Sequence, residues 1–329
     1  MTRNSVAFFA LALAVAAAPV FARGLAEEGS FDRTLKVNGP VELRVSTGSG
    51  TIKVSRGSGS EVHISARIKA NEWGSFWSTS STDQIKEIER NPPVRQEGNR
   101  IIIGDEHGRR FEHITISYEI TTPQETRLNA TSGSGGVEAF DVHGPADLGT
   151  GSGTITAERI GAEVHAQTGS GGITISRAGG SVHSSTGSGS ITASDVTGEV
   201  DASTGSGNIT VTHATGRVRA HAASGRVKVE QAVGDLDVHS SSGGLDVEGS
   251  PKGARWDLET ASGSVRVLLP SSAGFELDAH AGSGSVSTTH KVMVSGSMAR
   301  GELHGTAAGT GSSDNHLRIR TASGSIRIE

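Results

Sequence analysis

Apolar and polar residues alternate along this chain in short runs that recur every 18 residues. In the repeat that begins at Gly153, the apolar positions are Ile155 and Ala157, followed nine residues later by Val164 and Ala166. Nearly the same pattern follows each of seven glycines: Gly135, Gly153, Gly171, Gly189, Gly207, Gly225 and Gly243. Alternation of this kind is typical of a β-strand with one buried face. Each repeat is therefore predicted to hold two short strands, with a turn after each.

The repeat divides into two halves of nine residues, which indicates a flattened coil. A second set of glycines marks the second turn, with Ala162 as its exception: Gly144, Gly180, Gly198, Gly216 and Gly234. A fixed period of this length is typical of stacked copies of one structural unit. Three-sided left-handed helices also have 18-residue coils, but they place apolar residues every six positions, and that period is absent here. We predict an all-β fold, a two-sided parallel β-solenoid, right-handed by the general preference of parallel crossovers.

Stacking places equivalent residues of successive coils over one another, about 4.8 Å apart. Glycine is expected at the turns because a sharp reversal needs φ > 0, and the neighbouring Ser and Thr can hydrogen-bond the turn backbone. The inward positions predict an aliphatic ladder of Val137, Ile155, Ile173, Ile191, Ile209, Val227 and Leu245. One outer column contains Thr156, Thr174, Thr192 and Thr210. The opposite column reads Asp147, His165, His183, Asp201, Arg219 and Asp237.

The regular pattern is interrupted near the N-terminus by an aromatic cluster and a short helix. Trp73, Phe76 and Trp77 stand together in a chain with only 8 Phe, 3 Trp and 1 Tyr. A helix is predicted over Asp83 to Arg90, with Thr82 as its N-cap. We expect the cluster and helix to cover the open end of the solenoid, because an unprotected sheet edge pairs with other chains. Contact with a ligand such as a sugar ring is the alternative for the three aromatic residues.

The first 22 residues have the pattern of a secretory signal peptide. One basic residue precedes an Ala- and Leu-rich run that closes with a small residue. A membrane anchor is the competing interpretation, but the run is shorter than the roughly 20 residues that an anchor needs. After cleavage we expect no transmembrane span and a periplasmic or extracellular location. The predicted organisation is a signal peptide over 1–22, an N-terminal linker over 23–34, and a solenoid over 35–329 with an insertion at about 70–99.

Weaker copies of the pattern extend it on both sides of the regular repeats. Val62 and Ile64 are expected to belong to an early coil, and residues 321–328 to the final coil. Features outside the repeats are Tyr118, Ile120, Pro123, Leu128, Leu268-Leu269-Pro270, Phe275, Leu277 and Gly282-Ser283-Gly284. In this order they resemble a bacterial putative-adhesin family of unknown function, over roughly residues 35–329. The resemblance implies an exported β-strand-repeat protein of the cell envelope, without catalytic residues to carry over.

Composition removes several classes of function. The chain has no cysteine, which excludes disulfides, thiolate metal sites and a lipidated cysteine. Arg3 is the one charged residue of the predicted signal peptide, so the remaining chain has 29 basic and 35 acidic residues and a net charge of −6. No basic field is therefore expected to bind nucleic acid. Calcium-binding rolls share the nine-residue half-coil, but they need aspartate-bearing turns, and the turns here read Thr-Gly-Ser-Gly.

The strongest candidate for chemistry is the pair His165 and His183, with Asp147 and Asp201 on either side. A metal site or an acid–base pair is conceivable there, but no third converging ligand is expected on an open face, so exposed strand residues are the preferred interpretation. The acidic residues are too dispersed for a pectinolytic site, and the Ser-Gly turns lack the strand-to-helix context of a catalytic serine. The threonine column resembles one half of an ice-binding array, but such arrays normally pair two columns, and high β-propensity on a solvated face is the preferred interpretation.

The sequence therefore predicts a non-enzymatic exported protein, without cofactor or metal, that offers its solenoid surface for adhesion or assembly. Its expected partner is a cell-surface, glycan or envelope protein component of unknown identity. A carbohydrate-active enzyme or carbohydrate-binding β-helix is one alternative. An envelope-stress or regulatory binding module is the other.

Overall fold

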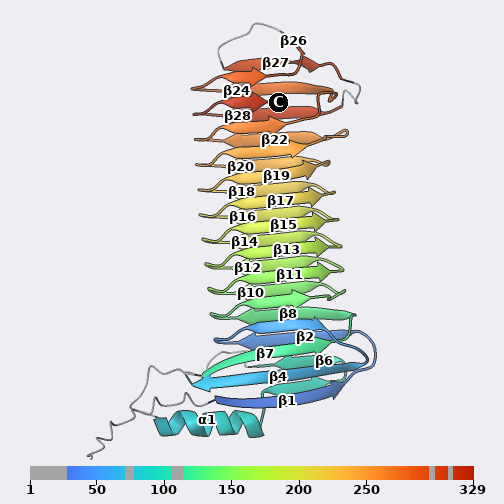
Figure 1. Cartoon of the computed structure of the whole chain (residues 1–329), viewed down its shortest axis with the longest axis vertical. Helices are drawn as coiled ribbons and strands as arrows, with labels where there is room; N and C mark the ends of the chain where they lie inside the picture. The colour runs from blue at the N-terminus through green and yellow to red at the C-terminus, as the bar shows by residue number, and fades with distance from the viewer. Residues whose placement is uncertain (1–27, 71–77, 105–113, 296–300, 310–313) are drawn as a thin grey trace, which may run out of the picture.

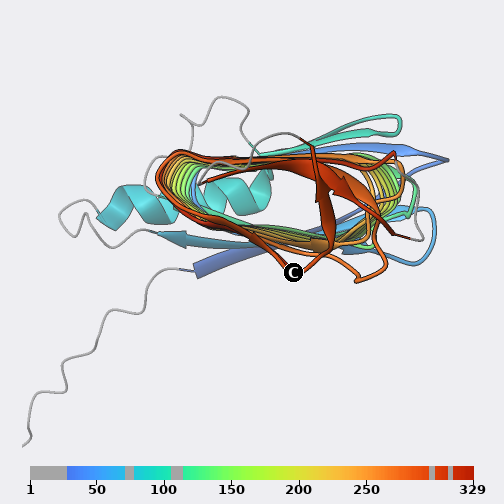
Figure 2. The same ribbon diagram turned by 90° about the horizontal axis from the view of Figure 1, so that it is seen from above.

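The computed structural model describes residues 28–70, 78–104, 114–295, 301–309 and 314–329. The chain forms a tall stack of coils, each passing once through two facing sheets (Figure 1). Sheet A contains 14 strands and sheet B contains 15. Viewed along the stack, the coils superimpose into a flattened ring with two long sides (Figure 2). The predicted all-β, two-sided parallel solenoid is confirmed.

The regular middle of the stack covers residues 126–249 and alternates between the two sheets. Its sheet A strands are β9 (Val137–Phe140), β11 (Ile155–Ile160), β13 (Ile173–Ala178), β15 (Ile191–Val196), β17 (Ile209–Ala214), β19 (Val227–Ala232) and β21 (Leu245–Gly249). Its sheet B strands are β8 (Thr126–Ser132), β10 (Ala146–Thr150), β12 (Val164–Thr168), β14 (Val182–Thr186), β16 (Val200–Thr204), β18 (Val218–Ala222) and β20 (Leu236–Ser240). Neighbouring strands run parallel, and Ile191 lies beside Ile173 and Ile209, so each coil is 18 residues long.

The interior of the regular middle is a thin aliphatic layer. The seven residues of the predicted ladder each expose at most 1% of their surface. Thr192, one residue along from Ile191, points outward. Buried and exposed positions alternate along these strands, as a half-buried parallel sheet requires, except that two outward residues in succession precede the last buried residue of β11, β13, β15, β17 and β19.

The repeat glycines are required by close stacking of the coils rather than by φ > 0. A Cβ at Gly153 would lie 2.0 Å from the carbonyl oxygen of Gly135, and none of the seven repeat glycines has a left-handed backbone. In the regular middle the left-handed residues, with φ between 55° and 58°, are instead six non-glycine residues at or just after the ends of sheet A strands: Asp141, Arg159, Arg177, Asp195, His213 and Gln231. The predicted reason for the turn glycines was wrong, because the contact that demands glycine joins two coils and is invisible within one.

Buried hydroxyl groups tie each turn to the coil before it. Thr150 Oγ1 donates a hydrogen bond to the carbonyl oxygen of Gly135 (2.8 Å) and accepts one from the N–H of Gly153 (3.1 Å). Thr168, Thr186 and Thr204 make the same two bonds one coil further along each time. This column confirms that Ser and Thr hydrogen-bond the turns. Ala222 interrupts it, since alanine has no hydroxyl.

The N-terminal end departs from the parallel pattern. Its elements are β1 (Glu28–Lys36), β2 (Val41–Thr47), β3 (Ile52–Arg56), β4 (Glu61–Ala70), α1 (Ser78–Arg90), β5 (Val94–Glu97), β6 (Arg100–Ile103) and β7 (Ile114–Thr122). β4 pairs antiparallel with both β1 and β7, so Val62 and Ile64 do not form the early coil that the sequence predicted. The apolar alternation of a strand is the same in either direction, and it could not distinguish the two.

Helix α1 lies across this end of the stack, below β1 (Figure 1). Ile85 and Ile88 are buried in the core, and the Ser30 N–H donates to Glu89 Oε1 (3.0 Å). The helix begins at Ser78 rather than at the predicted Asp83. The residues before Asp83 are mostly Ser and Thr, which favour helix caps over helix interiors, so the sequence indicated a later start. The predicted linker over 23–34 ends earlier, since β1 already begins at Glu28. Among the residues described, no helix has the length and apolar character that crossing a membrane demands.

The C-terminal end contains an intercalated coil. Its strands are β22 (Arg255–Thr260), β23 (Val265–Leu268), β24 (Phe275–Ala281), β25 (Val286–Thr288), β26 (Val292–Val294), β27 (Glu302–Ala307), β28 (His316–Thr321) and β29 (Ile326–Ile328). β28 lies between β22 and β24, and β29 lies between β23 and β25. The coil nearest the C-terminus in sequence is thus not the outermost in space. β26 and β27 extend the end by antiparallel pairing.

Candidate functional site

The outward surface of sheet B, called here the histidine face, carries most of the histidines that the structure describes. Seven of the 13 histidines of the chain point outward from its strands: His165, His183, His221, His239, His280, His304 and His316. Six of them lie within 4 Å of a carboxylate oxygen. The parallel register brings these residues into columns, because residues 18 apart in sequence are strand neighbours.

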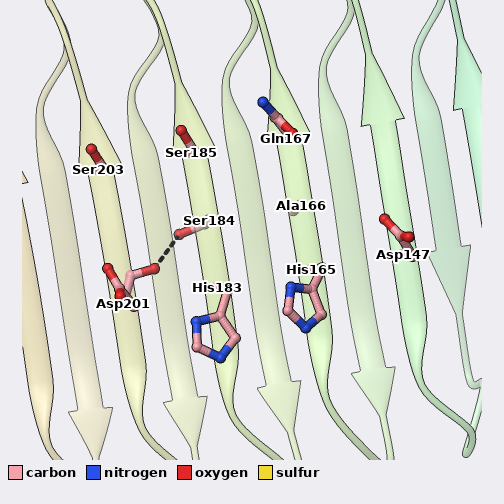
Figure 3. Close-up of a pocket in the computed structure, with 9 residues that line it drawn as sticks. All are labelled: Asp147, His165, Ala166, Gln167, His183, Ser184, Ser185, Asp201 and Ser203. Carbon is pink, nitrogen blue, oxygen red and sulfur yellow. Dashed lines mark hydrogen bonds between the residues drawn. The ribbon is translucent and has the colours of Figure 1, made fainter.

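His165 and His183 occupy neighbouring strands at the centre of this face (Figure 3). Their rings are stacked, with centroids 4.8 Å apart and planes inclined by 18°. Glu163 lies two residues before His165 and therefore on the same side of the strand. Its Oε1 is 2.9 Å from His165 Nε2 and 3.4 Å from His183 Nε2. Three possible ligand atoms thus converge, and the expectation that no third ligand would do so was wrong.

A shallow hollow of about 480 Å³ surrounds the two imidazoles. Asp147 and Asp201 border it on either side, in the same column as the histidines (Figure 3). Asn129 Nδ2 donates to Asp147 Oδ2 (3.1 Å), which fixes one border. The hollow is open, and eight of its nine lining residues have polar side chains, so it can receive an ion or a hydrophilic group without displacing packed side chains.

A second stacked pair, His221 and His239, lies further along the face. The ring centroids are 5.1 Å apart and the planes are nearly parallel. His239 Nε2 is 2.7 Å from Asp237 Oδ1, whereas its Nδ1 is 3.5 Å from Glu259 Oε2. The carboxylates therefore approach opposite sides of one ring and do not converge between the two imidazoles.

Arginine–aspartate pairs join successive coils near the ends of the strands. Arg159 makes two hydrogen bonds to Asp141, and this contact lowers the pKa of the Asp141 carboxyl. Asp235 accepts the backbone N–H of Arg255 (2.9 Å) and a bond from Arg217 Nη2 (2.9 Å), which together lower the pKa of its carboxyl. These pairs are exposed, so each one contributes little to stability.

The outer face of sheet A is chemically different. The predicted threonine column is present, with Thr156, Thr174, Thr192 and Thr210 in register. Hydroxyl groups replace the imidazoles and carboxylates of the histidine face at these positions. The two faces of one coil therefore offer different surfaces to a partner.

The predicted contact residues Trp73, Phe76 and Trp77 lie outside the described residues. The adjoining helix supplies Ile85 and Ile88 to the core, and this supports the covering role that the sequence proposed for the whole insertion. The residue that sequence reasoning missed is Glu163. Its position two residues before His165 was the available indication, because alternate residues of a strand share a face.

Most of the repeats match a known protein family. The family model described as Toastrack DUF4097 matches residues 154–329, more than half of the chain. The chain belongs to the Toastrack DUF4097 family. No curated protein matches it.

Two solved structures align with this Toastrack DUF4097 chain over most of its length. A putative cell adhesion protein from Clostridium sporogenes is 12% identical, with a TM-score of 0.21, over 92% of this chain and 99% of that one. A putative adhesin from Parabacteroides distasonis is 8% identical, with a TM-score of 0.31, over 91% of this chain and 96% of that one. At these scores, neither likeness bears on function.

Proposed function

We propose that this protein is a non-enzymatic, exported component of the cell envelope, or a secreted protein, that uses the histidine face as a surface for adhesion or assembly. The carrying observation is the arrangement of its ionisable groups. They stand in straight columns on an open face, with His165 and His183 both exposing more than 40% of their side chains. Such columns suit contact with an extended polar partner, which can repeat its interactions from coil to coil.

Catalysis demands a different arrangement. Groups that stabilise a transition state work best in a preorganised, water-excluded site. The hollow around His165 and His183 is shallow and open to solvent along the sheet. This openness argues against the alternative of a carbohydrate-active enzyme and is compatible with binding.

Export rests on the sequence of residues 1–22, which has the charged start, apolar run and small closing residue of a signal peptide. The partner we propose is a glycan or an envelope protein at the cell surface. Trp73, Phe76 and Trp77 are proposed to help cover the N-terminal end; contact with a sugar ring is their alternative role. A regulatory binding module of the envelope is the second candidate, since its surface needs are the same.

The test separates binding from turnover. Purified protein is screened for binding to and cleavage of envelope polysaccharides, beside a variant of the histidine face, Asp201→Ala with Arg219→Ala, and a matched variant of the other face, Thr192→Ala with Thr210→Ala. We expect binding without cleavage, weakened only by the first variant. Cleavage abolished by a single acidic substitution would establish the enzyme instead. Failure of every polysaccharide, together with specific crosslinking to one envelope protein, would favour the regulatory module.

A further inference from the structure

The three side chains that converge on the histidine face have the donor set of a metal site. We propose that Glu163, His165 and His183 bind one divalent transition-metal ion of the Zn²⁺ type. The proposal is independent of adhesion, because it concerns only what these three side chains can hold.

The distances fit a common ion. A tetrahedral Zn²⁺ about 2.0–2.1 Å from each ligand separates two ligand atoms by roughly 3.3 Å. Glu163 Oε1 is 2.9 Å from one imidazole Nε2 and 3.4 Å from the other. All three donors lie within 4.8 Å of one another, so we expect rotation of the side chains alone to bring them to an ion.

The sheet holds the donors in place. His165 and His183 are direct neighbours in the parallel register of β12 and β14, and Glu163 directly precedes β12. Val164, between two of the ligands, is fully buried. The positions of the ligand Cα atoms are thus fixed by the packed core, and little conformational entropy of the backbone is lost on binding.

The donor set selects the class of ion. Two imidazoles and one carboxylate suit Zn²⁺, Ni²⁺ and Cu²⁺, whereas Ca²⁺ and Mg²⁺ prefer oxygen ligands throughout. Three protein ligands leave a further coordination position for water, as in open zinc sites. The exposed fractions of the Glu163, His165 and His183 side chains are 48%, 53% and 41%, so this position faces solvent.

The second histidine pair provides a matched control on the same face. His221 and His239 are stacked like the first pair, but the nearby carboxylates of Asp237 and Glu259 approach separate nitrogens of one ring. Among the described residues, Glu163, His165 and His183 form the one group of three such donors that converges within 4.8 Å. Comparing the two pairs therefore distinguishes the effect of stacked imidazoles from the effect of a carboxylate that both imidazoles share.

The experiment titrates Zn²⁺ into the purified protein by calorimetry. We expect one ion per chain, with affinity lowered roughly tenfold or more by His183→Ala and by Glu163→Gln, and unchanged by His239→Ala. A crystal soaked in Zn²⁺ should show an anomalous peak between the three ligands. Because these side chains are exposed, the variants should fold normally, and melting curves by circular dichroism check this.

Three outcomes would overturn the proposal. One is absence of Zn²⁺ binding to the folded wild-type protein. Another is wild-type affinity in His183→Ala, which would place binding elsewhere, for instance at His107 or His113, outside the described residues. The third is an equal loss in His239→Ala, which would mean that exposed imidazoles on this face bind the ion without regard to the shared carboxylate.

Discussion

The regular middle of the solenoid and its two ends cover their apolar interior by different means. In the middle, every coil is covered by an almost identical coil on each side, so aliphatic residues such as Ile191 and Ala193 suffice to fill the interior. At the ends a neighbour is missing on one side. There the chain uses a helix at one end and antiparallel strands at both, and near the C-terminal end it also buries the large side chains of Trp256 and Phe275.

The difference shows how a chain poor in aromatic residues can still fold. Stacking buries each aliphatic layer between two others, and stability is then approximately a sum of nearest-neighbour terms. A coil at an end has a stabilising neighbour on one side only, and its exposed strand edge is a template for pairing with another chain. The irregular elements are therefore the part of the molecule that ends the stack at each side and covers its last coils.

The largest effect is expected from removing the cover of the N-terminal end. Deletion of residues 71–91 takes away α1 with Ile85 and Ile88 and exposes β1 and β4. We expect self-association, measured by light scattering, because the uncovered core and edge pair with other copies. A deletion variant that stays monomeric and stable would show that the end needs no cover. Loss of glycan binding in such a monomer would then assign the aromatic cluster to a ligand.

A charge inside the regular middle should cost several kcal/mol of unfolding free energy. Ile191→Asp places a carboxylate between Ile173 and Ile209, in an aliphatic layer that offers it no partner. Thr192→Asp is the control, one residue along and facing outward, and it should change stability little. Denaturant unfolding measures both. Equal effects of the two substitutions would contradict the inward ladder.

A small gain in stability is expected from repairing the interruption in the column of buried hydroxyl groups. Ala222 occupies the hydroxyl column between Thr204 and Ser240. Ala222→Thr should restore the bonds to Gly207 and Gly225 and stabilise the protein by about 1 kcal/mol. Ala220→Thr, which is buried in the same strand but outside the column, is the comparison and should destabilise. A rise in melting temperature in neither variant would show that the column does not contribute.

The smallest effect concerns the junction of the middle and the C-terminal end. Asp235 accepts bonds from Arg217 and from Arg255, which begins β22, and its pKa is lowered from the ordinary 3.8. A lowered folded-state pKa stabilises above the ordinary value, and this contribution is lost as pH falls through the folded value. Acid unfolding of Asp235→Asn should therefore depend slightly less on pH below about 4 than that of the wild type. Identical profiles would remove Asp235 from the acid response.

The same comparison explains what the sequence could predict. Period, register and inward ladder follow from one coil repeated, so Ile155 or Val218 could be placed without a structure. The antiparallel direction of β4, the start of α1 and the intercalated β28 depend on contacts that occur only once. Glu163 was missed for a related reason: it directly precedes β12 and lies outside the two outer columns that the repeat pattern placed. The steric need for glycine at Gly153 arises between coils and leaves no trace in the spacing within one.

The intercalated coil also has a consequence for how the molecule is completed. β28 fills the gap between β22 and β24, both of which precede it in the sequence, so the stack cannot close in the order in which the ribosome makes it. A chain shortened before Asn315 would not be a slightly shorter rod, because it would leave two unpaired strand edges facing each other within the wall. Such an unfinished product would be conspicuous to proteases and chaperones. The wall of the solenoid at this end is therefore continuous only once β28 and β29 have taken their places between the earlier strands.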